Sequence, residues 1–163
     1  IYISADIEGT CGIVHWDETQ LENNLSTYNK DQMTKEVNAA CLGVNDLKKS
    51  DILIKDAHDS ARNINPMNLP ENVEILRGWT KDPHVMMGGI DKSFDASLFI
   101  GYHSPATFNG NPLSHTLDTQ FDYIKINDDI ASEFTINAYT SAYYNVPVPF
   151  LSGDEMLCEH AKN

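Results

Sequence analysis

Short apolar runs alternate with amphipathic helical stretches along the chain, and this alternation restricts the possible folds more than any other feature. Residues 96–102 form a continuous apolar run, which is typical of a strand covered on both faces in a parallel sheet. Residues 31–49 carry apolar side chains every three or four positions, which predicts a helix. Strands separated by helices in this way favour an α/β domain whose sheet is mainly parallel.

Shorter patterns predict the rest of the fold. Residues 122–130 alternate in polarity and are expected to turn at 127–129, as a hairpin does. Ser132 is a suitable N-cap for a helix that reaches Tyr144, and Asp154 is expected to start the last helix. The other β-rich runs are expected to be strands, at residues 1–7, 51–57, 73–76 and 146–151. The expected fold class is α/β, with a mainly parallel sheet, flanking helices and an added hairpin.

The charge balance of the chain excludes some classes of partner. Among 163 residues, 11 are Lys or Arg and 24 are Asp or Glu, which gives a net charge of −13. Nucleic acid and anionic membranes require clustered cations, which the sequence lacks, and no apolar run reaches the roughly 18 residues that span a membrane. The excess carboxylates fit a solubilising surface or a divalent-metal site. Three cysteines without paired spacing favour a reducing, cytoplasmic location.

Candidate metal ligands follow three of the expected strands. Asp6 and Glu8 stand two residues apart at the end of the first strand, so both carboxylates face one side. His58 follows the second strand, and His103 follows the apolar run at 96–102. The carboxyl ends of parallel strands meet at one edge, so these side chains are expected to converge as ligands for Zn, Mn or Fe. Taken singly, the carboxylates also fit a solvated strand end or a helix cap, and each imidazole fits a loop histidine bonded to backbone.

Two residues farther along the chain have less specific patterns. His115 follows a loop rich in Gly, Pro and Asn, and is either a surface histidine or an acid–base group beside the metals. Glu133 lies in the first turn of an expected helix, where a carboxylate favourably meets the helix dipole in any case. A buried thiol is the expected role of Cys11. No role is assigned to the remaining histidines, His15, His84 and His160.

Five motifs in order resemble those of the D-aminopeptidase family of zinc peptidases. SADIEG, at residues 4–9, resembles the family signature S-x-D-x-E-G, and KDAHDS, at 55–60, resembles its Asp-x-His segment. FIGYHS at 99–104 and PLSHT at 112–116 resemble its Gly-Tyr-His and Ser-His segments. Residues 126–155 resemble a long family block that contains Asn-Ala-Tyr, Val-Pro-Val and Gly-Asp. Each motif alone is weak, but five in order with similar spacing across the chain are specific.

The resemblance implies a site with two zinc ions per subunit. The residues that match the family's metal ligands are Asp6, Glu8, His58, His103 and Glu133. His115 matches the proposed catalytic histidine of the family. Asp6 is our candidate for the residue that bridges the two ions.

The resemblance also implies an activity. We expect a zinc-dependent aminopeptidase that removes the N-terminal residue, of D-Ala type, from short peptides or amides through a water activated by two metals. A non-catalytic metal- or peptide-binding domain and a different metal-dependent amide hydrolase are the alternatives. Residues 1–163 are expected to form the metal-binding catalytic domain, the N-terminal part of a longer family architecture without its C-terminal domain, and family members are expected to form ring-like homo-oligomers.

Overall fold

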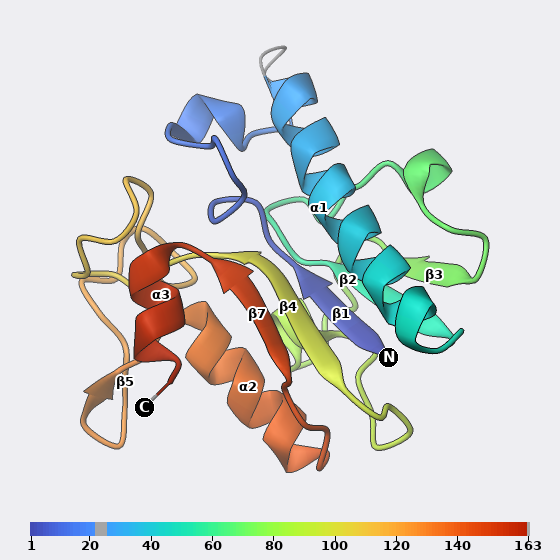
Figure 1. The fold of residues 1–163 in the computed structure, drawn as a ribbon. Helices are drawn as coiled ribbons and strands as arrows, with labels where there is room; N and C mark the ends of the chain where they lie inside the picture. The colour runs from blue at the N-terminus through green and yellow to red at the C-terminus, as the bar shows by residue number, and fades with distance from the viewer. Residues whose placement is uncertain (22–25, 163) are drawn as a thin grey trace.

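The computed structural model describes residues 1–21 and 26–162, which contain a five-stranded sheet in the order β3-β2-β1-β4-β7 (Figure 1). Every neighbouring pair of its strands is parallel. The strands are β1 (Tyr2–Ala5), β2 (Ile52–Asp56), β3 (Val73–Leu76), β4 (Ser97–Tyr102) and β7 (Phe150–Gly153). The predicted α/β class with a mainly parallel sheet is confirmed. Within the described residues, no helix combines the length and apolar character needed to cross a lipid bilayer.

Helices cover both faces of the sheet. Helix α1 (Ser26–Leu47) lies in front of the sheet in Figure 1 and buries Met33, Val37 and Cys41 against the strands. The opposite face packs against the 3-10 helix η3 (Val85–Met87) and helix α2 (Glu133–Tyr143), which contributes Phe134. Successive strand side chains point to opposite faces, so Ile3 faces the α1 side while Tyr2 faces the other. Burial on both faces explains the continuous apolar run in β4.

Local sequence signals place several of the other elements. Ser132 accepts a hydrogen bond from the Thr135 backbone and caps α2, as predicted. Asp154 caps the last helix, α3 (Glu155–His160), in the same way. The predicted hairpin is present as β5 (Lys125–Ile126) and β6 (Asp129–Ile130). Positive φ at Asn127 and Asp128 is what the tight turn between such strands requires.

Several predicted boundaries are wrong, and those of β1, α1 and β7 are informative. Strand β1 ends at Ala5 rather than at residue 7, because the chain turns there toward β4. Helix α1 starts at Ser26 rather than at residue 31, because its first turn is polar and carries no apolar periodicity. The strand predicted at 146–151 is instead Phe150–Gly153. Prolines at 147 and 149 have no N–H to donate, so regular pairing with β4 begins after them.

Two glycines allow the loop after β1 to cross the end of β4. The Gly9 amide donates to the Gly101 carbonyl at 2.8 Å, and the Asp6 amide donates to Ile100 at 2.8 Å. A Cβ atom at Gly9 would lie 1.7 Å from the Tyr102 carbonyl oxygen. A Cβ atom at Gly101, where φ is +71°, would lie 2.4 Å from the backbone carbonyl oxygen of Asp6. Only glycine fits either position. This crossing fixes the backbone of Asp6 between β1 and β4, where the strand order changes direction, and ligands of open α/β sheets bind at such points.

Candidate metal centre

The structure brings all six predicted site residues together at the carboxyl edge of the sheet, although they come from separate parts of the chain. Their side chains form two groups of potential metal ligands whose donor atoms lie within 4.8 Å of one another. One group follows β1 and β2, and the other combines the end of β4, the next loop and the start of α2. The two groups are Asp6, Glu8 and His58, and His103, His115 and Glu133.

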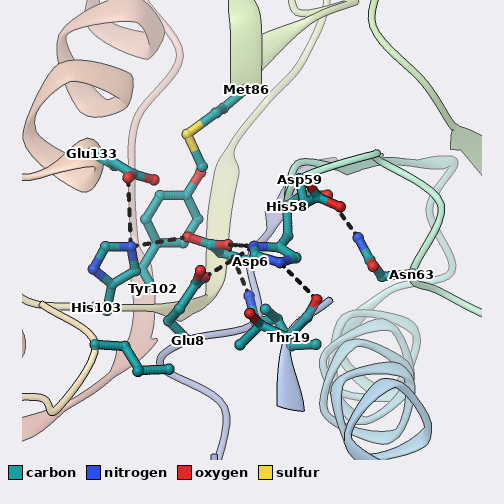
Figure 2. Close-up of polar contacts among 12 residues, drawn as sticks. Asp6, Glu8, Thr19, His58, Asp59, Asn63, Met86, Tyr102, His103 and Glu133 are labelled. Atoms are coloured by element: carbon teal, nitrogen blue, oxygen red, sulfur yellow. Dashed lines mark hydrogen bonds and ion pairs between the residues drawn. The ribbon is translucent and has the colours of Figure 1, made fainter. Parts of the chain in front are cut away.

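The first group is buried and its imidazole is fixed by the backbone. The Nε2 atom of His58 lies 3.0 Å from the Thr19 carbonyl oxygen, to which it donates as the N–H tautomer. Its Nδ1 atom therefore presents a lone pair to the carboxylates, 3.1 Å from Glu8 Oε2 and 3.4 Å from Asp6 Oδ1 (Figure 2). The ring is thus oriented as a metal ligand requires.

The second group repeats this arrangement with two imidazoles. The Nδ1 atoms of His103 and His115 lie 3.0 Å and 2.9 Å from the carbonyl oxygens of Ser104 and Leu113. Donation to these carbonyls leaves the Nε2 lone pairs free, and each Nε2 atom lies 3.5 Å from Glu133 Oε1. The two rings are stacked, with centroids 4.4 Å apart and planes 5° apart. Leu113 and Ser104 thus aim both rings at one carboxylate.

Asp6 connects the two groups. Its Oδ1 atom faces His58 and its Oδ2 atom faces His103 Nε2, at 3.4 Å and 3.5 Å, as the dashed lines in Figure 2 show. Within the described chain, Asp6 Oδ2, Glu8 Oε2 and His103 Nε2 are buried without a hydrogen-bond partner. Carboxylate oxygens that face imidazole lone pairs are stable only with a proton or a cation between them. This donor set, borderline nitrogens with hard oxygens, fits zinc.

The acid–base properties of the cluster show the same need for positive charge. Burial and the repulsion of Asp6 raise the pKa of Glu8. Burial raises the pKa of Asp6. The hydrogen bond from His58 and the charge of His103 have the larger opposite effect, and together they hold the pKa of Asp6 below the ordinary range. Burial lowers the pKa of His103, but Glu133, Asp6 and Glu8 together raise it to about 10. Without metal, the raised pKa values of His58 and His103 keep protons on these two imidazoles, which balance carboxylate charge.

Zinc binding is expected to release protons. A metal-bound imidazole must be neutral, whereas His103 with a pKa of about 10 is protonated at neutral pH. Apparent zinc affinity of the metal-free chain should therefore rise from about pH 6 to about pH 9, by about tenfold per pH unit for each proton displaced. Calorimetry at fixed pH in buffers of different ionisation enthalpy counts the protons. A pH-independent affinity without proton release would contradict this account of the site.

Supporting contacts hold the His58 loop, and no sequence motif predicts them. The buried carboxylate of Asp56 accepts from the Asn63 backbone at 2.6 Å and from its side-chain amide at 3.0 Å. The same Asn63 amide donates to the His58 carbonyl at 2.7 Å.

His115 is supported in a different way. Trp16 packs edge-on against the His115 ring, with ring centroids 5.1 Å apart. Thr19, Asn63 and Trp16 have no motif of their own, because their roles depend on contacts between segments distant in sequence.

The residues left unassigned lie outside the cluster. His84 is bonded at both ring nitrogens, to Asp82 at 2.9 Å and to the Tyr144 hydroxyl at 2.7 Å. His15 caps a short 3-10 helix, η1 (Trp16–Glu18), and His160 packs against Phe108. Cys11 is exposed, so the predicted buried thiol is wrong there: Cys11 lies in the turn after β1, outside the core.

An open cleft leads to the two groups. Its volume is about 450 Å³, enough for a short peptide but not for a folded protein segment. Asp6, Glu8, His58, His115 and Glu133 all line it. The fold and this cleft define an α/β protein with a candidate two-metal site at the carboxyl edge of its parallel sheet.

Comparison with known proteins identifies the family. A family model described as D-aminopeptidase matches residues 1–163, and the chain therefore belongs to the D-aminopeptidase family. It is 30% identical over 164 residues to the D-aminopeptidase of Bacillus subtilis (strain 168), covering 99% of this chain and 58% of that protein. The solved structure of the zinc-dependent D-aminopeptidase DppA from Bacillus subtilis, titled a self-compartmentalizing protease, superposes with a TM-score of 0.92 at 27% identity. This match also covers 99% of this chain and 58% of DppA, so the chain spans little more than half the length of these relatives.

Proposed function

We propose that the chain is the metal-binding catalytic domain of a zinc-dependent aminopeptidase. In this proposal, Asp6, Glu8 and His58 would hold one zinc ion, His103 and Glu133 would hold a second, and Asp6 would be shared between them. The substrate is a short peptide or amide, and the bond hydrolysed follows an N-terminal residue of D-Ala type. Family membership and the name of the zinc-dependent relative support the class of reaction.

One observation carries the metal assignment. Imidazole nitrogens and carboxylate oxygens from separate segments face each other at 3.1–3.5 Å, and three of these atoms are buried with no hydrogen-bond partner in the described chain. A purely structural cluster of this kind would be expected to contain donors between the acceptors, as Asn63 does for Asp56. Two buried acceptor sets joined by one carboxylate match the requirements of two divalent ions.

The protein's own groups orient the substrate and move protons. Zinc held by these residues would supply Lewis acidity for a carbonyl and would lower the pKa of a bound water. The free amine of the substrate meets the negative charge of the cleft, which explains cleavage at the N-terminal residue. His115 is held by Leu113 with Nε2 as its free nitrogen, and it is positioned to accept and return a proton or to stabilise the developing oxyanion.

Metal content is the direct test of the site. Protein purified without chelator is expected to contain about two divalent ions per chain, with zinc as the main ion, because two groups of ligands are present. All proposed ligands lie at or before residue 133, so we expect residues 1–163 to be sufficient to bind the two ions. Elemental analysis and anomalous scattering from a crystal measure number and position. Absence of transition metal, and no uptake of added zinc, would refute the assignment.

Assembly and location are further parts of the proposal. The relative DppA is described as self-compartmentalizing, and on that likeness we propose a homo-oligomer. The three cysteines are free, as a cytoplasmic location would favour. Light scattering measures the molar mass of the protein in solution and so gives the number of subunits. The acidic surface remains unsuited to nucleic acid or anionic membranes, as expected from the net charge of −13.

The alternative is a domain that binds metal or peptide without hydrolysis. A second alternative is a different metal-dependent amide hydrolase on the same scaffold. Turnover of D-alanine dipeptides and D-alaninamide by zinc-loaded protein separates the three. Hydrolysis of both substrates supports the aminopeptidase, metal binding without hydrolysis of any amide supports the binding domain, and hydrolysis only of other amides supports the second alternative.

A further inference from the structure

The face of α2 that packs against the sheet carries a row of polar side chains. Glu133, Asn137 and Ser141 follow one another at intervals of four residues, so they lie on one face of the helix, and all three are buried. A helix packed against a sheet usually presents apolar side chains there. Phe134 does so beside the row, with its ring centroid 5.2 Å from that of Phe99. We call Glu133, Asn137 and Ser141 the polar row.

Two members of the polar row are hydrogen-bonded to polar side chains of β4. The Asn137 amide donates to the Tyr102 hydroxyl at 3.0 Å. One turn later, the Ser141 hydroxyl donates to the Ser97 hydroxyl at 3.1 Å. The residue numbers rise along α2 and fall along β4, so the helix runs antiparallel to the strand. Two such contacts define both the position of α2 along β4 and its rotation, and they place the first member of the row, Glu133, at the carboxyl end of the strand.

The contact of Asn137 belongs to a buried chain of hydrogen bonds with a defined direction. The Ser4 hydroxyl donates to the Met86 carbonyl at 2.9 Å, so Tyr102 is the donor in its 2.6 Å contact with Ser4. The Tyr102 oxygen therefore accepts from Asn137, whose amide also donates to Met86 Sδ at 3.4 Å. Both neighbours of the amide nitrogen are acceptors, so the Asn137 side chain has one favourable orientation. The chain joins α2 to β4, β1 and η3.

Stability alone does not require polar side chains on this face of α2. Replacing both partners of a buried hydrogen bond by apolar groups of the same shape is nearly neutral for stability. Buried polar networks in which every donor is satisfied instead specify one arrangement of their elements.

One arrangement matters here because Glu133 enters the candidate metal centre from a helix. A slide of α2 by one turn would move its carboxylate by about 5.4 Å away from His103. The Leu117 amide donates to Glu133 Oε1 at 2.8 Å, but Leu117 lies in a loop, so this bond orients the carboxylate without fixing α2 on the sheet. Asp6, by contrast, is fixed relative to β4 by backbone hydrogen bonds.

We infer that Asn137 and Ser141 are positioning residues, which hold α2 in the register that keeps the Glu133 carboxylate 3.5 Å from His103 Nε2. This inference rests on the proposed zinc centre and assigns a role there to two residues that would contact neither zinc nor substrate. They act through the helix: their hydrogen bonds to β4 set its register, and the register sets the distance between the two ligands of the second group.

The main test removes the Asn137 contact without leaving an unpaired donor. The double variant Asn137→Leu/Tyr102→Phe replaces both partners by apolar side chains of similar shape, so its Tm should stay within about 4 °C of the parent. One of the two zinc affinities should fall by about tenfold or more, as is typical when a group that orients a metal ligand is lost, and the other should not change. Titration with zinc against a chromophoric chelator measures both affinities. Anomalous scattering shows whether the weakened ion is the one beside Glu133.

Ser141→Ala tests the second contact by a smaller change. It removes one hydroxyl and should weaken the same zinc ion by about threefold, the effect of one ordinary hydrogen bond. Because it leaves the aromatic packing of the interface intact, it also keeps the inference testable if the double variant does not fold.

Tyr2→Phe is the matched control. Tyr2 is buried in the same apolar cluster as Tyr102, and its hydroxyl donates to the Gly88 carbonyl at 3.0 Å. Loss of this hydroxyl leaves the carbonyl unpaired, so Tm should fall by about 3 °C or more, while both zinc affinities should match those of the parent. If zinc affinity simply followed stability, Tyr2→Phe would lose more zinc than the double variant, and that result would overturn the inference. Unchanged zinc affinities in both the double variant and Ser141→Ala would overturn it as well.

Crystal structures of the metal-free proteins test the register apart from zinc binding. In the double variant, the separation of Glu133 Oε1 and His103 Nε2 should increase from 3.5 Å by about 1–2 Å, the usual size of a shift between packed elements. In Tyr2→Phe it should not change. Parent protein that binds no zinc would refute the proposed function, while these structures would still decide the positioning role. An α2 that keeps its place on β4 in the double variant would refute that role.

Discussion

Replacement of Asp6 by asparagine is expected to lower metal content from about two ions per chain to less than one and to reduce turnover by about a thousandfold or more. Asparagine keeps the shape but loses the charge, and only one oxygen remains to serve the two groups that Asp6 Oδ1 and Oδ2 now face. A metal ion contributes several kcal/mol to the transition state of hydrolysis, and about 4 kcal/mol corresponds to a thousandfold in rate.

The single-group ligands provide a graded comparison for this result. His58→Ala should lower occupancy mainly in the first group, and His103→Ala mainly in the second, each with a parallel loss of activity. Asp59→Asn is the matched control, because Asp59 lines the same cleft but belongs to neither group, and it should retain both ions. Elemental analysis and titration with zinc measure occupancy. Two tightly bound ions in Asp6→Asn would show that Asp6 does not bridge them.

Replacement of His115 by alanine is expected to leave most of the metal bound while reducing kcat by about a hundredfold or more. His115 presents Nε2 to the cleft and is only partly buried, unlike His103, which is fully enclosed. Loss of a positioned acid–base group typically costs a hundredfold to ten-thousandfold in rate. Steady-state kinetics with D-alaninamide, together with metal analysis of the same preparation, measure both quantities.

Metal loss would assign His115 a different role. Its Nε2 atom lies 3.5 Å from Glu133 Oε1, close enough to complete the second group. If His115→Ala binds only one ion, His115 is a ligand and the catalytic assignment is wrong. His160→Ala serves as the control, because His160 lies in α3 and packs against Phe108, outside both groups of potential ligands. It should match the parent in metal content and in rate.

The sequence was sufficient to predict the main elements and the positions of the candidate ligands. Apolar runs that are buried on both faces, such as β4, can be recognised because burial and composition are linked locally. Caps such as Ser132 are equally local, since one side chain satisfies the amides of the next turn. Boundaries were predicted less well, as at β7, because proline and pairing with β4 set its start together.

Convergence of the ligand side chains was predicted in outline, from the rule that parallel strands end at one edge. The motifs also selected the six candidate residues, which the structure places close together. The motifs could not specify how each side chain is oriented. A histidine two residues from an aspartate can bind metal, cap a helix or bond to that aspartate, as the His84 ring does with the Asp82 carboxylate. Residue type and spacing are the same in each case, and only neighbours distant in sequence decide between them.

The tertiary structure decided which atoms of the candidate ligands face one another and what surrounds them. The Thr19 carbonyl, 39 residues from His58, selects the nitrogen that His58 presents to Asp6 and Glu8. The crossing of Gly9 over Gly101 places Asp6 between two groups of potential metal ligands. The positive φ angles of Val85 and Leu117 follow from how their loops are anchored, not from their own preferences. A sequence fixes local propensity, whereas tautomer, bridging geometry and backbone strain are set by contacts that exist only after the chain has folded.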